Sequence, residues 1–277
     1  MSERASQPSR RSVVGATRRL GEQTAFYGQA LVSTPDAIRR YPTMVLRQIA
    51  NMGIGTGALA VIGGTVVIIG FLTLSTGALI AVQGYNTLSN VGIEALTGFL
   101  GAFLNVRFIA PATAGVALAA TIGAGATAQI GAMRINEEID AIESMAIRPI
   151  PYLVSSRLVA SLVVVVPLYI LGLVGTYVAT DVLITTFYGQ SSGTYDHYFR
   201  TFVSTRDVML SGVKVVVLTT LVTLIHCYHG YTASGGPAGV GVAVGRAVRT
   251  SIVVINIVDL LLSMFIWGAT TTVRLAG

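Results

Sequence analysis

Long apolar blocks separated by short polar segments dominate the chain from residue 53 onward. Five blocks are long enough to cross a hydrocarbon core of about 30 Å as helices, which takes about 20 residues each. The predicted spans are residues 53–82, 95–130, 158–188, 208–231 and 251–273. Every backbone N–H and C=O must be paired inside a bilayer, which favours helices over open strands. The pattern therefore predicts an all-α, polytopic membrane protein.

The first fifty residues follow a different, amphipathic pattern. Residues 1–11 are rich in Ser, Pro and Arg, and we expect a disordered basic tail. Across residues 12–50, apolar side chains recur at helical spacing beside arginines, and Tyr41-Pro42 interrupts the pattern. We expect interfacial helices here, with a solvated tail as the alternative. A transmembrane domain over residues 51–277 would follow.

One densely charged segment, residues 131–149, interrupts the apolar blocks. At helical period Ile135, Ile139 and Ile142 form an apolar stripe, and Pro149 is expected to end the helix. Arg134 and Glu138 have the spacing of an i,i+4 ion pair. A helix over residues 133–148 is expected to lie at the membrane surface and face water or a soluble partner; a plain solvated connector is the alternative. Its candidate contact residues are Met133, Arg134, Glu137, Glu138, Asp140, Glu143 and Arg148.

Composition and charge support the membrane assignment. The 277 residues are 53% hydrophobic and only 11% charged, and the net charge is +6. The arginines cluster beside the apolar blocks, which is typical of membrane orientation and not of nucleic-acid binding. Most of them lie in the N-terminal region, in the charged segment and directly after a glycine-rich turn over residues 235–245 (Arg246 and Arg249), whereas the loop over residues 83–94 has none. We therefore expect the first three on the cytoplasmic side.

Three ionisable residues fall inside or at the ends of predicted spans, where charge is costly and usually has a partner. At 1.5 Å per residue, Lys214 lies about 10 Å from the outer end of its span and Asp259 about 12 Å from the inner end of its own. The remaining gap of about 8 Å in a 30 Å core is within reach of a lysine. We predict a buried Lys214–Asp259 pair. Arg107, near the outer end of the second span, could bind an anionic head group or reach the interface.

Other patterns limit the chemistry. Gly115, Ala119 and Gly123 recur every four residues, which favours close helix packing. His226 and His229 flank Cys227, but no third ligand lies near them, so no metal site is expected. The chain has a single lysine outside any glycine-rich phosphate loop, which excludes ATP hydrolysis by that route. We expect no catalytic residues.

Two segments and one single residue together resemble the MlaE/YrbE permeases of lipid-transporting ABC systems: residues 131–157, residues 230–241 and Asp259. Arg107, Pro111 and Lys214 also match residue types of that family. The resemblance implies an N-terminal interfacial helix, five spans and a coupling helix over residues 133–148 that docks on a cytoplasmic ABC ATPase dimer. ATP and Mg would be bound by that ATPase, and no cofactor by this chain. The lipid, such as a fatty acid or sterol, would be imported across the inner (plasma) membrane.

The resemblance also implies further partners, namely a second YrbE-like permease chain and periplasmic Mce-domain proteins. Phe108, Thr121 and Gln129 stand where many members carry charged residues. Their loss resembles the B-type YrbE subunit of actinobacterial Mce (mammalian cell entry) systems, which pairs with a non-identical chain. Two alternatives from other classes remain: a proton-coupled secondary transporter using Asp259, and an intramembrane lipid-modifying enzyme using His226, His229 or Asp259.

Overall fold

Helices are the only secondary structure in residues 10–53 and 60–268, the part of the chain that the computed structural model describes. The all-α prediction is confirmed. The N-terminal helices are α1 (Arg10–Val32), α2 (Thr34–Arg40) and α3 (Pro42–Gly53). The long apolar helices are α4 (Ala60–Ser89), α9 (Ser156–Val182), α11 (Thr205–Tyr231) and α12 (Gly236–Trp267), together with the run α5 (Thr97–Leu104), α6 (Ala110–Leu118) and α7 (Ala124–Ile135). Two shorter helices are α8 (Glu138–Ser144) and α10 (Ser192–Phe202).

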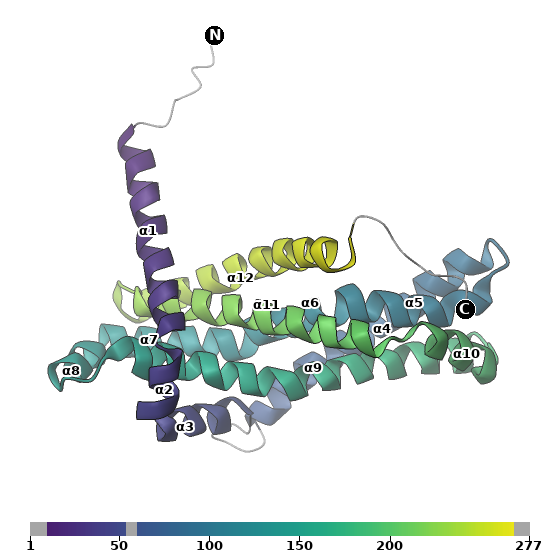
Figure 1. Ribbon diagram of the computed structural model, residues 1–277, viewed down its shortest axis with the longest axis horizontal. Coiled ribbons are helices and arrows are strands. Elements are labelled where there is room, and N and C mark those ends of the chain that lie inside the picture. The colour runs from purple at the N-terminus through teal and green to yellow at the C-terminus, as the bar shows by residue number, and fades with distance from the viewer. Residues whose placement is uncertain (1–9, 54–59, 269–277) are drawn as a thin grey trace, which may run out of the picture.

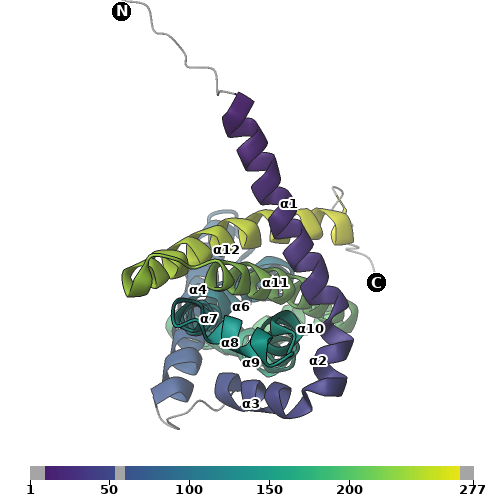
Figure 2. The ribbon, with the colours of Figure 1, turned by 90° about the vertical axis from the view of Figure 1, so that its left-hand side faces the viewer.

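The long helices form an elongated bundle with α8 at one end and α5 and α10 at the other (Figure 1). Within it, α4 packs on α9, while α11 packs on α7, α9 and α12. The N-terminal helices lie at the α8 end, where α1 and α3 run across the bundle axis (Figure 2). α1 begins at Arg10, so the last two residues of the predicted tail, 10 and 11, are helical. Residues 1–9 lie outside the described part.

Five helices in the described residues are long and apolar enough to cross a membrane, as the sequence predicted. They are Val67–Ser89, Glu94–Ile135, Ile150–Phe187, Thr205–Tyr231 and Gly236–Trp267. Three predicted loops are wrong in extent. The loop at 83–94 is helical through Ser89, the glycine-rich turn at 235–245 belongs mostly to α12, and the connection at 189–206, between the third and fourth predicted spans, contains α10. Packing against neighbouring elements stabilises these stretches, and α10 is held by Tyr195, which is buried against α5.

The second span is longer than a straight crossing requires. Its 42 residues extend about 63 Å at 1.5 Å per residue, roughly twice a 30 Å core. Two π-helical segments interrupt it, at Asn105–Ile109 and Ala119–Gly123. The first directly precedes Pro111, which lacks a backbone N–H and disturbs the regular α-helical ladder. A span of this length is therefore expected to project beyond the apolar core.

Helix α1 is fixed to the bundle through its second half. Phe26 and Ala30 are buried, and the Phe26 ring packs 5.4 Å from Tyr231 and 5.5 Å from Tyr228, both in α11. The Ser155 hydroxyl also donates a hydrogen bond of 2.7 Å to the Ala30 carbonyl oxygen. Burial raises the pKa of the neighbouring Tyr27 hydroxyl. The α1–α11 contact therefore sets the direction in which α1 leaves the bundle.

The predicted small-residue stripe faces two helices. A Cβ atom added at Gly115 would lie 3.4 Å from the Ile255 side chain of α12, an ordinary contact. A Cβ atom at Gly123 would lie 2.7 Å from the imidazole ring of His226 in α11. Ala119, between them, is fully buried. A side chain at position 123 would therefore clash with α11, whereas position 115 has room for a methyl group beside α12.

This difference gives a matched test. We expect Gly123→Ala to reduce the free energy of unfolding by about 1–3 kcal/mol, because the added methyl group overpacks a buried ring. Gly115→Ala should be nearly neutral. The single cysteine, Cys227, is buried, so a thiol-reactive dye reports unfolding directly in a thermal scan of the purified protein. Equal melting temperatures for the two variants would contradict the close packing of Gly123 against His226 of α11.

Candidate functional site

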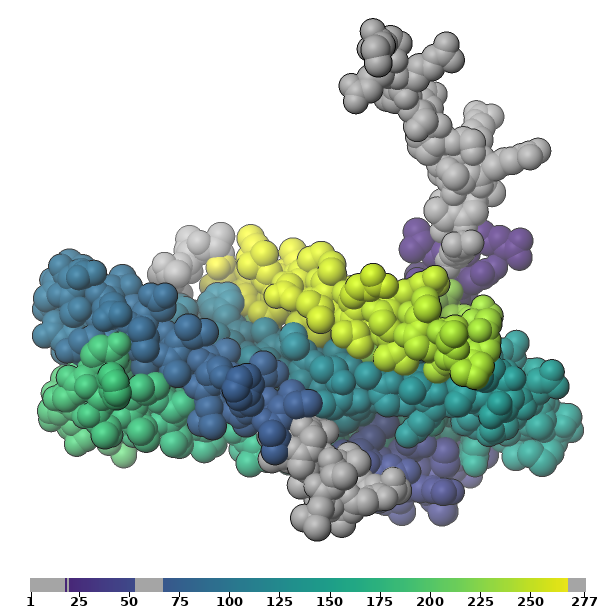
Figure 3. Space-filling model, turned by 180° about the vertical axis from the view of Figure 1, so that it is seen from behind, coloured from purple at the N-terminus to yellow at the C-terminus, as the bar shows by residue number. Residues whose placement is uncertain are grey.

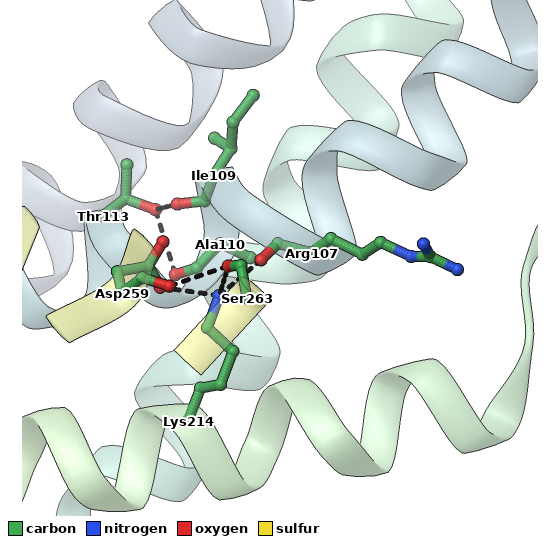
Figure 4. Close-up of polar contacts among 7 residues, drawn as sticks. All are labelled: Arg107, Ile109, Ala110, Thr113, Lys214, Asp259 and Ser263. Carbon is green, nitrogen blue, oxygen red and sulfur yellow. Dashed lines mark hydrogen bonds and ion pairs between the residues drawn. The ribbon is translucent and has the colours of Figure 1, made fainter. Parts of the chain in front are cut away.

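The buried charges of α11 and α12 meet in the interior of the bundle. Lys214 Nζ lies 2.8 Å from Asp259 Oδ1, and the two side chains are 0% and 7% exposed. Nζ also donates hydrogen bonds to the Ser263 hydroxyl at 2.7 Å and to the Arg107 carbonyl oxygen (Figure 4). The contact with Asp259 is an ion pair between oppositely charged side chains. The structure thus forms the predicted Lys214–Asp259 pair.

Pro111 explains why a lysine belongs at this depth. In a regular helix the N–H of residue 111 would donate to the carbonyl of residue 107, but proline has no N–H. Lys214 donates to that same Arg107 oxygen, from another helix. A buried carbonyl without a partner costs free energy, and a buried ammonium needs acceptors. The proline, the π-helical segment before it and the lysine therefore form one interdependent polar site.

Arg107 itself points away from this site (Figure 4). Its guanidinium forms an ion pair of 2.9 Å with Asp207, at the start of α11. It also lies 4.2 Å from the Phe103 ring and 5.1 Å from the Trp267 ring, and Trp267 Nε1 donates to Asp207 at 2.9 Å. Both charged side chains are less than one-fifth exposed. The structure therefore gives Arg107 a protein partner, which neither sequence-based alternative included.

Asp207, Ser263 and Trp267 also belong to this site, although they were not among the residues predicted from the sequence. A signal for Asp207 existed, because it is an acid in the first turn of a span that enters from the same side as Arg107. Ser263 follows Asp259 by one helical turn and donates to its carbonyl oxygen at 2.7 Å. These residues connect the second, fourth and fifth spans near the α10 end of the bundle.

The charged segment at the opposite end differs from its predicted form. A continuous helix over 133–148 is wrong: α7 ends at Ile135, Glu137 adopts a left-handed conformation (φ 59°), and α8 covers only Glu138–Ser144. Pro149 precedes the next helix and does not end this one. The break also changes the pairing, since Arg134 contacts Asp140 at 2.8 Å and not Glu138.

The amphipathic character of this segment is nevertheless present. Ile139 is fully buried, and Ile142 and Met133 pack against the same cluster of apolar side chains. The four acids of the segment lie on its exposed surface: Glu137, Glu138, Asp140 and Glu143. Arg148 is also exposed and forms an ion pair of 2.6 Å with Asp36 of α2. α8 is thus a short, firmly anchored helix with an acidic outer face at the end of the bundle.

The histidines of α11 lie away from the buried Lys214–Asp259 pair. His226 is fully buried, and its Nδ1 lies 2.8 Å from the Thr127 hydroxyl of α7. Twelve positions of α11 separate His226 from Lys214, about 18 Å of helix, so Asp259 lies far from the imidazole. In the described residues no group of three or more His, Cys, Asp or Glu side chains is arranged to hold a metal ion.

Comparison with known proteins identifies the family. The profile of "Permease MlaE" matches residues 54–265, which is most of the chain and includes all of the buried charges above. The chain belongs to the MlaE permease family. It is therefore the membrane subunit of an ABC transporter and a multi-pass membrane protein.

Several curated proteins are similar to this MlaE-family permease. A probable ABC transporter permease protein of Rickettsia felis is 30% identical over 236 residues, covering 80% of this chain and 83% of the relative. The intermembrane phospholipid transport system permease protein MlaE of Haemophilus influenzae is 25% identical over 265 residues, covering 94% and 96%. The chloroplastic protein trigalactosyldiacylglycerol 1 of Arabidopsis thaliana is 25% identical over 189 residues, covering 68% and 54%.

Proposed function

We propose that this permease moves a lipid across the inner membrane, in the direction of import, with energy from a separate cytoplasmic ABC ATPase dimer that binds ATP and Mg. The observation that carries the proposal is the acidic outer face of α8, a short helix anchored at the end of a five-span bundle. A rigid element of this kind can transmit a rigid-body movement between two chains. The name of the Haemophilus relative supports a phospholipid as substrate, beside fatty acids and sterols.

The orientation follows from the distribution of arginines. Most arginines of the described residues lie in α1–α3, around α8 and in the first half of α12, which are the parts of the chain toward the α8 end (Figures 1 and 2). Because cytoplasmic segments carry the excess of Lys and Arg, the α8 end faces the cytoplasm and the α10 end the outside. α1 and α3 then lie in the membrane interface, since they run across the bundle axis at that end.

A second YrbE-like permease chain would complete the lipid path. α12 is the least buried of the five spans and lies on the outer face of the bundle (Figure 3). From Ile252 onward most of its exposed side chains are large and apolar, including Ile257, Leu261 and Phe265. We assign this face to contact with the second chain and with lipid. Periplasmic Mce-domain proteins would cover the α10 end, and the missing charges at Phe108, Thr121 and Gln129 favour the B-type subunit.

The experiment that tests this proposal is purification of the tagged full-length chain from native membranes in mild detergent, with mass spectrometry of the co-purifying chains. We expect an ABC ATPase, a second related permease and Mce-domain proteins. Recovery of one permease sequence with the ATPase would remove the B-type assignment. Recovery of the folded chain alone, together with uptake driven by a pH gradient, would replace the proposal with proton-coupled transport through Asp259.

A further inference from the structure

A hollow of about 240 Å³ lies between α2, α3 and the start of the third span, at the α8 end of the bundle. Arg40 and Arg47 line it, together with Tyr41 and Tyr152, whose rings pack edge to face at 5.3 Å. Met44 also lines the hollow. We call it the α3 hollow. It is separate from the buried ion pair and from the acidic face of α8.

The α3 hollow has an excess of positive charge. Helices α2 and α3 carry three arginines against one acid, Asp36, a net charge of +2. Asp36 Oδ2 is held by Arg148 at 2.6 Å, whereas Arg40 reaches Asp36 Oδ1 only at 3.9 Å. Arg47 forms no ion pair within the described residues. Two guanidinium groups therefore remain available to an anion, and guanidinium matches the oxygens of a phosphate in two-point hydrogen bonding.

The two helices that line the hollow also expose aliphatic side chains, which a site for a free ion would not require. Leu46 of α3 is 65% exposed and Ile38 of α2 is 51% exposed, although both are aliphatic. α3 lies toward the α8 end of the bundle, next to α2 (Figure 1). A ligand seated between the arginines would thus contact Met44 in the hollow, on helices that also carry these exposed aliphatic side chains. Tyrosines are typical of the membrane interface.

We infer that the α3 hollow binds the phosphate of an anionic phospholipid head group from the leaflet on the α8 side. Basic pockets beside spans on the cytoplasmic side are suited to such head groups. The two arginines would hold the phosphate, the tyrosine rings would frame it, and Met44, Leu46 and Ile38 would contact the acyl chains. The site would attach the N-terminal helices to the bilayer and does not depend on ATP or on lipid movement.

Native mass spectrometry of the full-length protein with added dioleoyl phosphatidylglycerol tests the inference, with dioleoyl phosphatidylcholine as the zwitterionic comparison. We expect tighter binding of phosphatidylglycerol. The double variant Arg40→Gln with Arg47→Gln should weaken it roughly tenfold to thirtyfold, because each basic residue near an anionic lipid contributes about a factor of five. Binding of phosphatidylcholine should stay unchanged. Both arginines are exposed, so the fold should tolerate the change.

The matched control is Arg39→Gln with Arg249→Gln, which removes two exposed arginines from the same end without touching the hollow. Phosphatidylglycerol binding should then stay within about twofold of the wild type. An equal loss in the control, or equal binding of the two lipids by the wild type, would overturn the inference. So would inorganic phosphate binding as tightly as phosphatidylglycerol, since the apolar side chains would then contribute nothing. Transport by the complex is not part of this readout, so failure here leaves the proposed function standing.

Discussion

Lys214→Met is expected to lower the free energy of unfolding by about 3–5 kcal/mol, the largest effect of a single substitution in this protein. It removes the cation from a site where the Asp259 side chain is 7% exposed, and it leaves the Arg107 carbonyl without its lysine donor. Asp259→Leu should have a comparable effect, because it leaves a buried ammonium without its counter-charge. The measurement is thermal unfolding in detergent, followed by dye labelling of the buried Cys227.

The double variant Lys214→Met with Asp259→Leu should recover most of the lost stability, since replacing both members of a buried pair by apolar side chains is often neutral. The exposed pair Arg200–Asp196, at 3.3 Å, provides the matched control. Arg200→Met or Asp196→Leu should cost less than about 1 kcal/mol because solvent screens that pair. Single variants of the buried pair that behave like those of the exposed pair would refute the structural role of Lys214 and Asp259.

Reversing the charge of the α8 face should have the second large effect, on function and not on folding. Glu137→Lys with Glu138→Lys is expected to reduce the co-purifying ATPase and the lipid uptake at least about tenfold, because like charges at a docking surface cost several kcal/mol. Both side chains are exposed, and lysine fits the left-handed position 137 as well as glutamate does. The measurement is lipid uptake by proteoliposomes that contain the purified complex, together with its ATP hydrolysis.

The control for that experiment changes the same amount of charge elsewhere. Glu22→Lys with Asp196→Lys alters two exposed acids of α1 and α10 and leaves α8 intact. Its ATPase content and uptake should match the wild type. Normal uptake and a normal ATPase content in the Glu137→Lys with Glu138→Lys variant would show that the α8 face does not couple the two chains.

Several features followed from local sequence because they depend on local physics. A block of about 20 apolar residues crosses a bilayer as a helix whatever its neighbours are, which is why the number of spans was correct. The Lys214–Asp259 pair was also predictable, since the rise per residue fixes depth and an intramembrane charge needs a partner. Helix α10 was harder to predict from the sequence, because it depends on the packing of Tyr195 against another element.

Other features were decided only by the tertiary structure. Arg107 and Asp207 are 100 residues apart, and their contact depends on how each helix is rotated about its own axis, which no local pattern encodes. The left-handed Glu137 breaks a helix that the periodicity favoured, because packing of Ile139 into the interior sets the path of the chain. Lys214 reaches the carbonyl four residues before Pro111 for the same reason. The sequence by itself determined how many helices cross the membrane and at which depth its charges lie; the packing of those helices decided which groups meet, because side-chain partners depend on interhelical geometry and not on spacing along one helix.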